Sequence, residues 1–257
     1  MIEPVLTRRE GAVRWLVFNN VAKHNALTLE MNRALIDAIA AFGQAEDERV
    51  LVLAGAGEKA FMSGADISEF EGDEARVEAF GRDTRRMFQA LRDVAKPTVA
   101  MIRGYCIGGG LAVASCCDLR IAATDASFSI PAARLGVGYS AEFTKLLIDL
   151  VGPSFTKEIL YTARRYPADE ALAIGLVNRL VPATELEAFT ADYCAVIADN
   201  APLTQRAAKL VVAELLAGAH GEGSPGHAAV AACADSEDFR NAPRAFLEKR
   251  KPVFKGR

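Results

Sequence analysis

The sequence predicts an α/β protein whose strands form a largely parallel sheet. Over the first half of the chain, short runs rich in β-branched and aromatic residues alternate with longer amphipathic stretches. From residue 140 onward the strand patterns end, and about five helical segments separated by prolines follow. Because β-α-β alternation packs helices against a parallel sheet, we expect an α/β part near residues 1–139 and a helical remainder.

Each expected element follows from its own pattern. Four short runs predict strands, at residues 13–18, 50–53, 98–102 and 119–122. An amphipathic helix is expected at 29–47 with Thr28 as its N-cap, and a second helix at 74–94 with an apolar stripe on one face. The stretch 218–226, which has four glycines in nine residues, predicts a loop.

The composition restricts the classes of function. Hydrophobic residues make up 51% of the 257 positions, which excludes a disordered chain. The net charge of −3 lacks the basic excess that nucleic-acid binding needs. The longest uncharged run has 14 residues, between Arg103 and Asp118, and a membrane span needs ~20. Since residues 1–9 also lack the apolar stretch of a signal peptide, we expect a cytoplasmic protein without nucleic-acid or membrane partners.

The cysteines and histidines predict neither a disulfide framework nor a metal site. The five cysteines are an odd number without CxxC spacing and lie in apolar surroundings, which favours buried thiols. The three histidines lack the spacing of a metal-binding pair. We therefore expect no metal and no separate cofactor.

Two glycine-containing segments follow predicted strands. Residues 59–67 come after the strand at 50–53, and residues 104–112 come after the strand at 98–102. Neither contains a dinucleotide-binding or P-loop motif. Glycines at a helix start expose backbone N–H groups, so one donor from each segment could converge on a carbonyl oxygen as an oxyanion hole. Taken singly, each segment is also typical of a packing turn or of a glycine-rich helix start.

Several motifs occur in a fixed order along the chain. Residues 61–67 match the pattern F-x-x-G-A-D-[IL], and residues 104–110 match G-x-x-x-G-G-G. Residues 168–178 match A-x-E-A-x-x-x-G-L-V closely, and the dipeptide 202–203 and the ending 254–257 also fit. Together these motifs resemble the crotonase (enoyl-CoA hydratase/isomerase) superfamily.

The resemblance implies a fold, an assembly and a class of substrate. The fold would be a crotonase-like ββα superhelix, with the core and the active site over residues 1–195. Residues 196–257 would form a C-terminal helical region that assembles the chain into a homotrimer or homohexamer. The substrate would be an acyl-CoA thioester, with coenzyme A as part of the substrate rather than as a cofactor.

The resemblance also implies a set of site residues. The backbone N–H groups of Ala65 and Gly109 would polarise the thioester carbonyl, so that an enolate can form at the α-carbon. The segment from Ala65 to Ser68 would line the adenine and pantetheine end, and Lys255 would reach the CoA phosphates from a terminal helix. The implied substrate- and CoA-binding residues are Lys23, Ala26, Ala65, Asp66, Ile67, Ser68, Gly109 and Lys255. For the two lysines, a solvated surface charge is the alternative.

Two positions depart from the pattern of the superfamily. Its hydratases use a pair of glutamates, one to activate water and one to deliver a proton. The corresponding positions here are Ala112 and Ala132, and neither side chain can transfer a proton. We therefore expect slow or absent hydration of simple 2-enoyl-CoA substrates. The absence of the second glutamate also argues against the common isomerase mechanism, which relies on it.

Tyr139 and Glu142 are the candidate catalytic side chains near these alanines. Tyr139 could donate a hydrogen bond to a carboxylate or an enolate, or it could pack in the core. Glu142 could face the pocket, or it could be a first-turn glutamate favoured by the helix dipole. Residues 135–139, 235–239 and 244–252 resemble methylmalonyl-CoA decarboxylase-like members, in which a tyrosine falls on Tyr139. Those members have a histidine at the position of Ala65 and a glutamate at the position of Ala112, so the set is incomplete here.

Three functions follow from these residues. The first is an enzyme of the enoyl-CoA hydratase/isomerase type that acts on an acyl-CoA thioester through an enolate. The second is an acyl-CoA decarboxylase or another lyase that uses Tyr139, since decarboxylation needs no base. The third is an acyl-CoA-binding protein without catalytic activity. Intact oxyanion motifs favour an enzyme.

Overall fold

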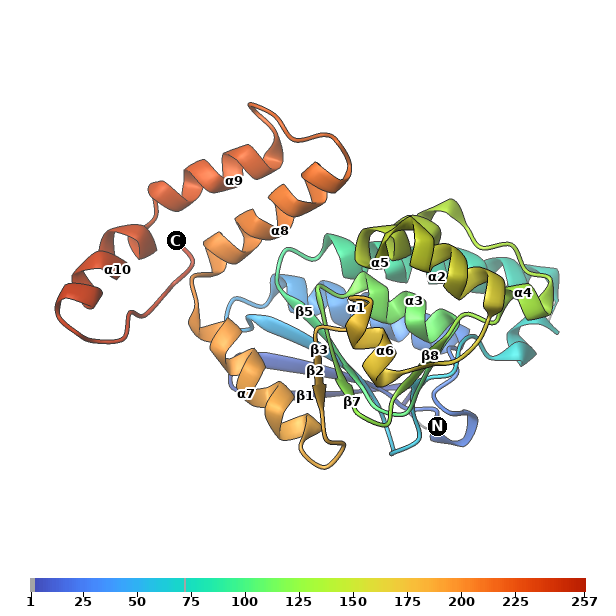
Figure 1. Cartoon of the computed structure of the whole chain (residues 1–257). Coiled ribbons are helices and arrows are strands. Elements are labelled where there is room, and N and C mark those ends of the chain that lie inside the picture. Colours follow the sequence, from blue (N-terminus) through green and yellow to red (C-terminus); the bar gives the residue numbers. More distant parts are fainter. Residues whose placement is uncertain (1–2, 72) are drawn as a thin grey trace.

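The computed structural model describes residues 3–71 and 73–257 and contains two sheets (Figure 1). The main sheet has the strand order β1 (Val5–Glu10), β2 (Val13–Phe18), β3 (Val50–Gly55), β5 (Thr98–Ile102), β7 (Leu119–Ala123) and β10 (Arg179–Val181). The second sheet has the order β4 (Ala60–Met62), β6 (Tyr105–Ile107), β8 (Ser127–Ser129) and β9 (Tyr166–Pro167). Apart from the antiparallel hairpin of β1 and β2, the main sheet is parallel, as predicted.

A ββα unit repeats along the chain. β3 leads into β4 and then α2 (Glu74–Asp93), and β5 leads into β6 and then α3 (Gly109–Cys116). β7 leads into β8, followed by α4 (Ala132–Leu135) and α5 (Ala141–Thr162). Each unit adds one strand to each sheet before its helix, which is the spiral arrangement that the resemblance implies. Because β4 and β6 are parallel neighbours, the segments that follow them leave the second sheet at the same edge.

Both faces of the main sheet are covered, and this explains why the central strand β3 has no polar side chain. Leu16 and Phe18 of β2 pack in a core with α1 (Leu29–Gln44), α2 and α3. Trp15, which comes directly before Leu16 in β2, points to the opposite face and packs in a second core with α7 (Leu186–Asp199). All three side chains are fully buried.

The two helices predicted in the first half begin at the expected residues. The side chain of Thr28 accepts a hydrogen bond from the Met31 N–H at 3.1 Å and caps α1, as expected. α1 ends at Gln44, three residues before the predicted end at 47. In α2 the apolar stripe is buried, with Phe80, Met87, Phe88 and Leu91 all inside.

The expected division near residue 139 is wrong. The chain returns to both sheets afterwards, through β9 and β10, and α6 (Ala168–Ala173) and α7 also pack with the α/β body. These two strands have two and three residues, too few to give an alternation pattern. β1 was also not predicted, because five of its six residues are exposed edge positions and four of them are polar or charged.

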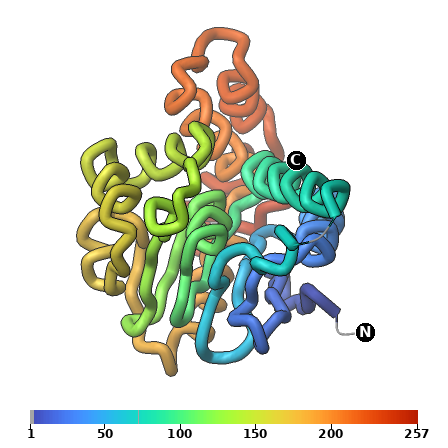
Figure 2. The backbone as a smooth tube through the Cα atoms, turned by 90° about the vertical axis from the view of Figure 1, so that its right-hand side faces the viewer, coloured from blue at the N-terminus to red at the C-terminus, as the bar shows by residue number. Residues whose placement is uncertain are grey.

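The last three helices project away from the α/β body in two perpendicular views (Figures 1 and 2). They are α8 (Pro202–Leu216), α9 (Pro225–Ala234) and α10 (Glu237–Leu247). The predicted loop 218–226 joins α8 to α9, although its last two residues form the first turn of α9. The expected boundary at 195/196 lies within α7, and the projecting helices begin at Pro202.

Most of the cysteines are buried as free thiols. Cys106, Cys116, Cys117 and Cys194 are buried free thiols, as predicted, and burial raises the pKa of each. Cys233 is half-buried. Within residues 3–71 and 73–257, no three His, Cys, Asp or Glu side chains form a group that could hold a metal ion. None of the helices in this part of the chain is long and apolar enough to cross a membrane.

Candidate active site

Two backbone N–H groups lie side by side where β4 and β6 end. Gly64 and Ala65 lie shortly after β4, and Gly109 begins α3 after Gly108, the residue that follows β6. A Cβ atom added to Gly109 would lie 3.6 Å from the Ala65 nitrogen, and a Cβ on Gly64 would lie 3.8 Å from the Gly109 nitrogen. The two segments that the sequence suggested for an oxyanion hole are therefore in contact.

The neighbouring backbone groups are paired, whereas these two N–H groups are not. The Asp66 N–H donates to the Leu27 carbonyl at 2.9 Å, and the Leu27 N–H donates to the Gly64 carbonyl at 2.8 Å. The Gly108 N–H donates to a carbonyl of β8 at 2.7 Å. In the part of the chain that the structure describes, the N–H groups of Ala65 and Gly109 have no acceptor. They are thus free to bind a carbonyl oxygen, with the positive end of the α3 dipole behind them.

Glycine is required here because two backbones approach closely. A Cβ on Gly110 would lie 2.2 Å from the Met62 carbonyl oxygen, so only glycine lets the start of α3 rest against β4. Gly64 and Gly108 have φ values of +111° and +54°, a region that other residues rarely adopt. These glycines therefore set the position of both N–H groups.

The two alanines lie in the wall of the main core. Ala112 belongs to α3, one turn after Gly109, and Ala132 is the first residue of α4. Both are buried in the same apolar cluster, against which Tyr139 packs. Neither position carries a group that could accept or donate a proton.

Tyr139 is a neutral phenol in an apolar setting. Burial raises its pKa far above the usual value of 10, and its ring lies 5.9 Å from that of Phe143. Within the described residues its hydroxyl has no hydrogen-bond partner, although the oxygen is not sealed from solvent. Tyr139 can therefore donate a hydrogen bond, but it is not poised to act as a base.

Glu142 forms an ion pair at the start of α5. Its Oε1 lies 3.0 Å from Nη2 of Arg92 on α2, and 39% of its side chain is exposed. Ser140 caps this helix and accepts a hydrogen bond from the Phe143 N–H. The partner and the exposure favour a stabilising first-turn glutamate over a group that faces a substrate.

Three of the implied CoA-binding residues, Lys23, Asp66 and Ser68, contact one another next to Ala65 in the chain. Nζ of Lys23 lies 2.7 Å from Oδ2 of Asp66 and 3.3 Å from the hydroxyl of Ser68. Burial acts to raise the pKa of Asp66, but hydrogen bonds from Lys23 and Ser68 outweigh it, so the pKa lies below its ordinary value. Ala26, three residues after Lys23 in the sequence, is buried, whereas the side chain of Ile67 is 74% exposed.

Lys255 lies elsewhere in the chain. It follows α10 in a tail without helical structure, so the expected terminal helix is wrong. Its backbone N–H donates to Asp238 at 2.7 Å, and the adjacent Phe254 carbonyl accepts from Arg49, just before β3 begins. Lys23 instead follows the far end of β2. Within one chain, Lys255 and Lys23 are therefore at opposite ends of the main sheet.

A known protein family matches nearly the whole chain. The family model described as enoyl-CoA hydratase/isomerase matches residues 8–257. The chain belongs to the enoyl-CoA hydratase/isomerase family. The match includes both glycine-containing segments, 59–67 and 104–112, and the projecting C-terminal helices.

Relatives of this family member cover nearly all of its length. It is 34% identical to a short-chain-enoyl-CoA hydratase of Clostridium acetobutylicum, over 96% of this chain and 95% of the relative. It is 33% identical to a crotonyl-CoA hydratase of Syntrophomonas wolfei, over 98% of both chains. A crystal structure of an enoyl-CoA hydratase/carnithine racemase from Magnetospirillum magneticum superposes with a TM-score of 0.91 at 33% identity, covering 100% of this chain and 97% of the other. The crotonase-like fold is therefore confirmed.

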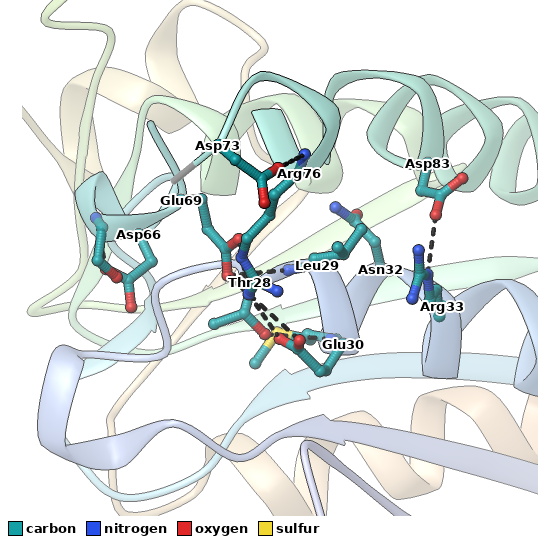
Figure 3. A network of polar contacts seen from close by, with 12 residues as sticks. Thr28, Leu29, Glu30, Asn32, Arg33, Asp66, Glu69, Asp73, Arg76 and Asp83 are labelled. Atoms are coloured by element: carbon teal, nitrogen blue, oxygen red, sulfur yellow. Dashed lines mark hydrogen bonds and ion pairs between the residues drawn. The ribbon is translucent and has the colours of Figure 1, made fainter. Parts of the chain in front are cut away.

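One residue of this family member next to the oxyanion segment was missed by the sequence reasoning. Glu69 lies in a short 3-10 helix, η2 (Ile67–Phe70), and is only 3% exposed (Figure 3). It stands three residues after Asp66, which caps η2, and this spacing is typical of a capping box. A capping box would predict that the Glu69 side chain accepts a hydrogen bond from the Asp66 N–H. In the structure it accepts from the Leu29 N–H of α1 and from Arg76 of α2 instead.

Proposed function

We propose that this family member binds an acyl-CoA thioester and stabilises an enolate through the N–H groups of Ala65 and Gly109. The observation that carries the proposal is the pair of adjacent donors without an acceptor in the described chain. A thioester carbonyl that accepts both hydrogen bonds gains acidity at its α-carbon, because negative charge moves onto the oxygen as the α C–H bond breaks. The proton goes to solvent water, because neither Ala112 nor Ala132 can accept it, and the electron pair is shared between the α-carbon and the oxygen.

The residues around this site argue against efficient hydration. The relatives are named as hydratases, which favours addition of water to a 2-enoyl-CoA. With Ala112 and Ala132, however, this chain lacks the paired carboxylates that the resemblance implies for water activation and proton delivery. We therefore assign the chain to enolate chemistry on an acyl-CoA thioester, with weak hydratase activity.

Mass spectrometry of thioesters incubated with the protein in D2O tests this assignment. The panel contains enoyl, saturated, methylmalonyl and aromatic acyl-CoA thioesters. We expect α-deuterium incorporation in at least one of them, and crotonyl-CoA hydration ~10²-fold or more slower than that of the Clostridium acetobutylicum hydratase assayed in parallel. Crotonyl-CoA turnover equal to that of the relative would contradict the weak-hydratase assignment. Binding of thioesters without any change in mass would favour an acyl-CoA-binding protein without activity.

A decarboxylase is the second candidate, and the neutral phenol of Tyr139 favours it. In this reaction the bond between the α-carbon and the carboxylate breaks, CO2 leaves, and the electron pair forms the enolate, which then takes a proton from solvent. No base is needed, so a phenol that only donates hydrogen bonds suits the step. Loss of CO2 from methylmalonyl-CoA in the same panel, reduced at least ~10-fold by Tyr139→Phe, is the expected result for this candidate. An unchanged rate in Tyr139→Phe removes the tyrosine from the mechanism.

CoA recognition and assembly are further parts of the proposal. The CoA portion would bind beside the segment from Ala65 to Ser68, near Lys23 and Ala26, and Lys255 would reach a CoA phosphate only from another subunit. Exposed apolar side chains on the projecting helices support such an assembly, among them Val212, Leu215, Phe246 and Leu247. We expect light scattering after size exclusion to give three or six times the chain mass of 27.5 kDa. A monomer would contradict the assembly.

A further inference from the structure

The buried carboxylate of Glu69 lies four residues after an oxyanion donor. Its carboxylate needs partners, because an unpaired buried charge is costly. Its Oε1 accepts a hydrogen bond at 3.2 Å from the N–H of Leu29, the first residue of α1. A carboxylate at this place is also stabilised by the positive end of the α1 dipole. Glu69 thus ties η2 to the start of α1.

Arg76 supplies the charge that Glu69 requires. Arg76 lies in the first turn of α2, and its Nη2 donates a hydrogen bond to Oε1 of Glu69 at 3.0 Å. The same nitrogen forms an ion pair with Oε2 of Glu69 at 2.9 Å. The same nitrogen lies 3.2 Å from Oε1 of Glu30 on α1. Figure 3 shows Arg76 reaching from α2 toward Glu69 and the start of α1. One side chain therefore joins η2, α2 and α1.

The oxyanion donor lies between two attachments to the same segment. The hydrogen bonds on either side of Ala65, through the Gly64 carbonyl and the Asp66 N–H, both go to Leu27. Glu69 makes the next attachment, to Leu29, two residues further along. The stretch from Gly64 to Glu69 is thus held at both ends by residues 27–29, with the free N–H of Ala65 inside it.

We propose that Glu69 is a positioning residue that fixes the direction of the Ala65 N–H through its bonds to Leu29 and Arg76. The inference rests on the proposed oxyanion role of Ala65. Without Glu69, the Leu27 bonds remain, but the segment after Asp66 loses its attachment to α1 and α2. The donor then spends less time aimed at the carbonyl oxygen, which affects the enolate more than the bound thioester.

The test compares Glu69→Ala and Glu69→Gln with Glu71→Ala. Gln keeps an acceptor for the Leu29 N–H but loses the charge that pairs with Arg76. Glu71 is an exposed neighbour with no ion pair in the described chain, and its replacement serves as the control. We expect Glu69→Ala to lower the rate of α-deuterium exchange ~10- to 100-fold with less than ~3-fold change in KM, and Glu69→Gln to lie between it and the wild type.

A second readout does not depend on turnover. The infrared carbonyl stretch of butyryl-CoA labelled with carbon-13 at the thioester carbonyl moves to lower frequency when N–H groups bind the oxygen. We expect a shift in the wild type and in Glu71→Ala, and a smaller shift in Glu69→Ala at saturating ligand. A wild-type shift that Glu69→Ala and Glu69→Gln retain in full overturns the positioning role alone. A wild type without any shift overturns the oxyanion assignment, and with it the positioning role.

Discussion

Gly110→Ala is expected to slow thioester chemistry strongly and to destabilise the fold. The added Cβ would lie 2.2 Å from the Met62 carbonyl oxygen and 2.9 Å from its carbonyl carbon, which are backbone atoms that a rotamer change cannot move. The start of α3 must therefore shift away from β4, and the Gly109 N–H shifts with it. We expect α-deuterium exchange to fall at least ~100-fold and the free energy of unfolding to fall by about 3 kcal/mol.

Gly109→Ala is the matched control, because it separates the site from the fold. Its Cβ would meet nothing closer than 3.6 Å, so the helix tolerates it. The methyl group nevertheless lies beside the Ala65 nitrogen, where the carbonyl oxygen would approach. We expect at least ~10-fold slower exchange with a free energy of unfolding within about 0.5 kcal/mol of the wild type. Full activity in Gly109→Ala would show that the carbonyl oxygen binds elsewhere.

Arg120→Met is expected to be the most destabilising substitution of a charged residue. Arg120 is 2% exposed, and its guanidinium donates to the carbonyls of Ala114 and Cys117 at the end of α3 and to that of Leu176. Methionine fills similar space but leaves these buried carbonyls without donors, at about 1–3 kcal/mol each. Burial lowers the pKa of Arg120, because the charged guanidinium is desolvated. Removing this buried charge therefore offsets part of the loss. We expect a net loss of about 2–4 kcal/mol.

Urea unfolding followed by the fluorescence of Trp15, the single tryptophan, measures this effect. Trp15 is fully buried in β2 and therefore reports on the α/β body. Arg179→Met, at an exposed position of the neighbouring β10, is the control and is expected to change stability by less than about 0.5 kcal/mol. A midpoint for Arg120→Met equal to that of the control would mean that water replaces the guanidinium at these carbonyls.

Local sequence patterns predicted an element correctly where the residues of that element alone favour its structure. The strand at 98–102 and the N-cap at Thr28 agree with the structure, because β-branched runs and capping side chains act over a few residues. β9 and β10 were missed because short strands are stabilised by their partners in the sheet rather than by their own composition. The terminal helix expected for Lys255 failed for a similar reason, since the tail is held by contacts to Asp238 and Arg49.

Residue types and their spacing were enough to predict the α/β class, the crotonase resemblance and the two glycine-containing segments, because these features are encoded locally in the chain. The folded structure showed that the N–H groups of Ala65 and Gly109 lie together without acceptors among the described residues. It also decided that Glu142 is paired with Arg92, and that Glu69 is buried against Leu29. The physical reason is that hydrogen-bond partners and burial depend on residues 40 or more positions apart in the chain, whose proximity no local pattern records.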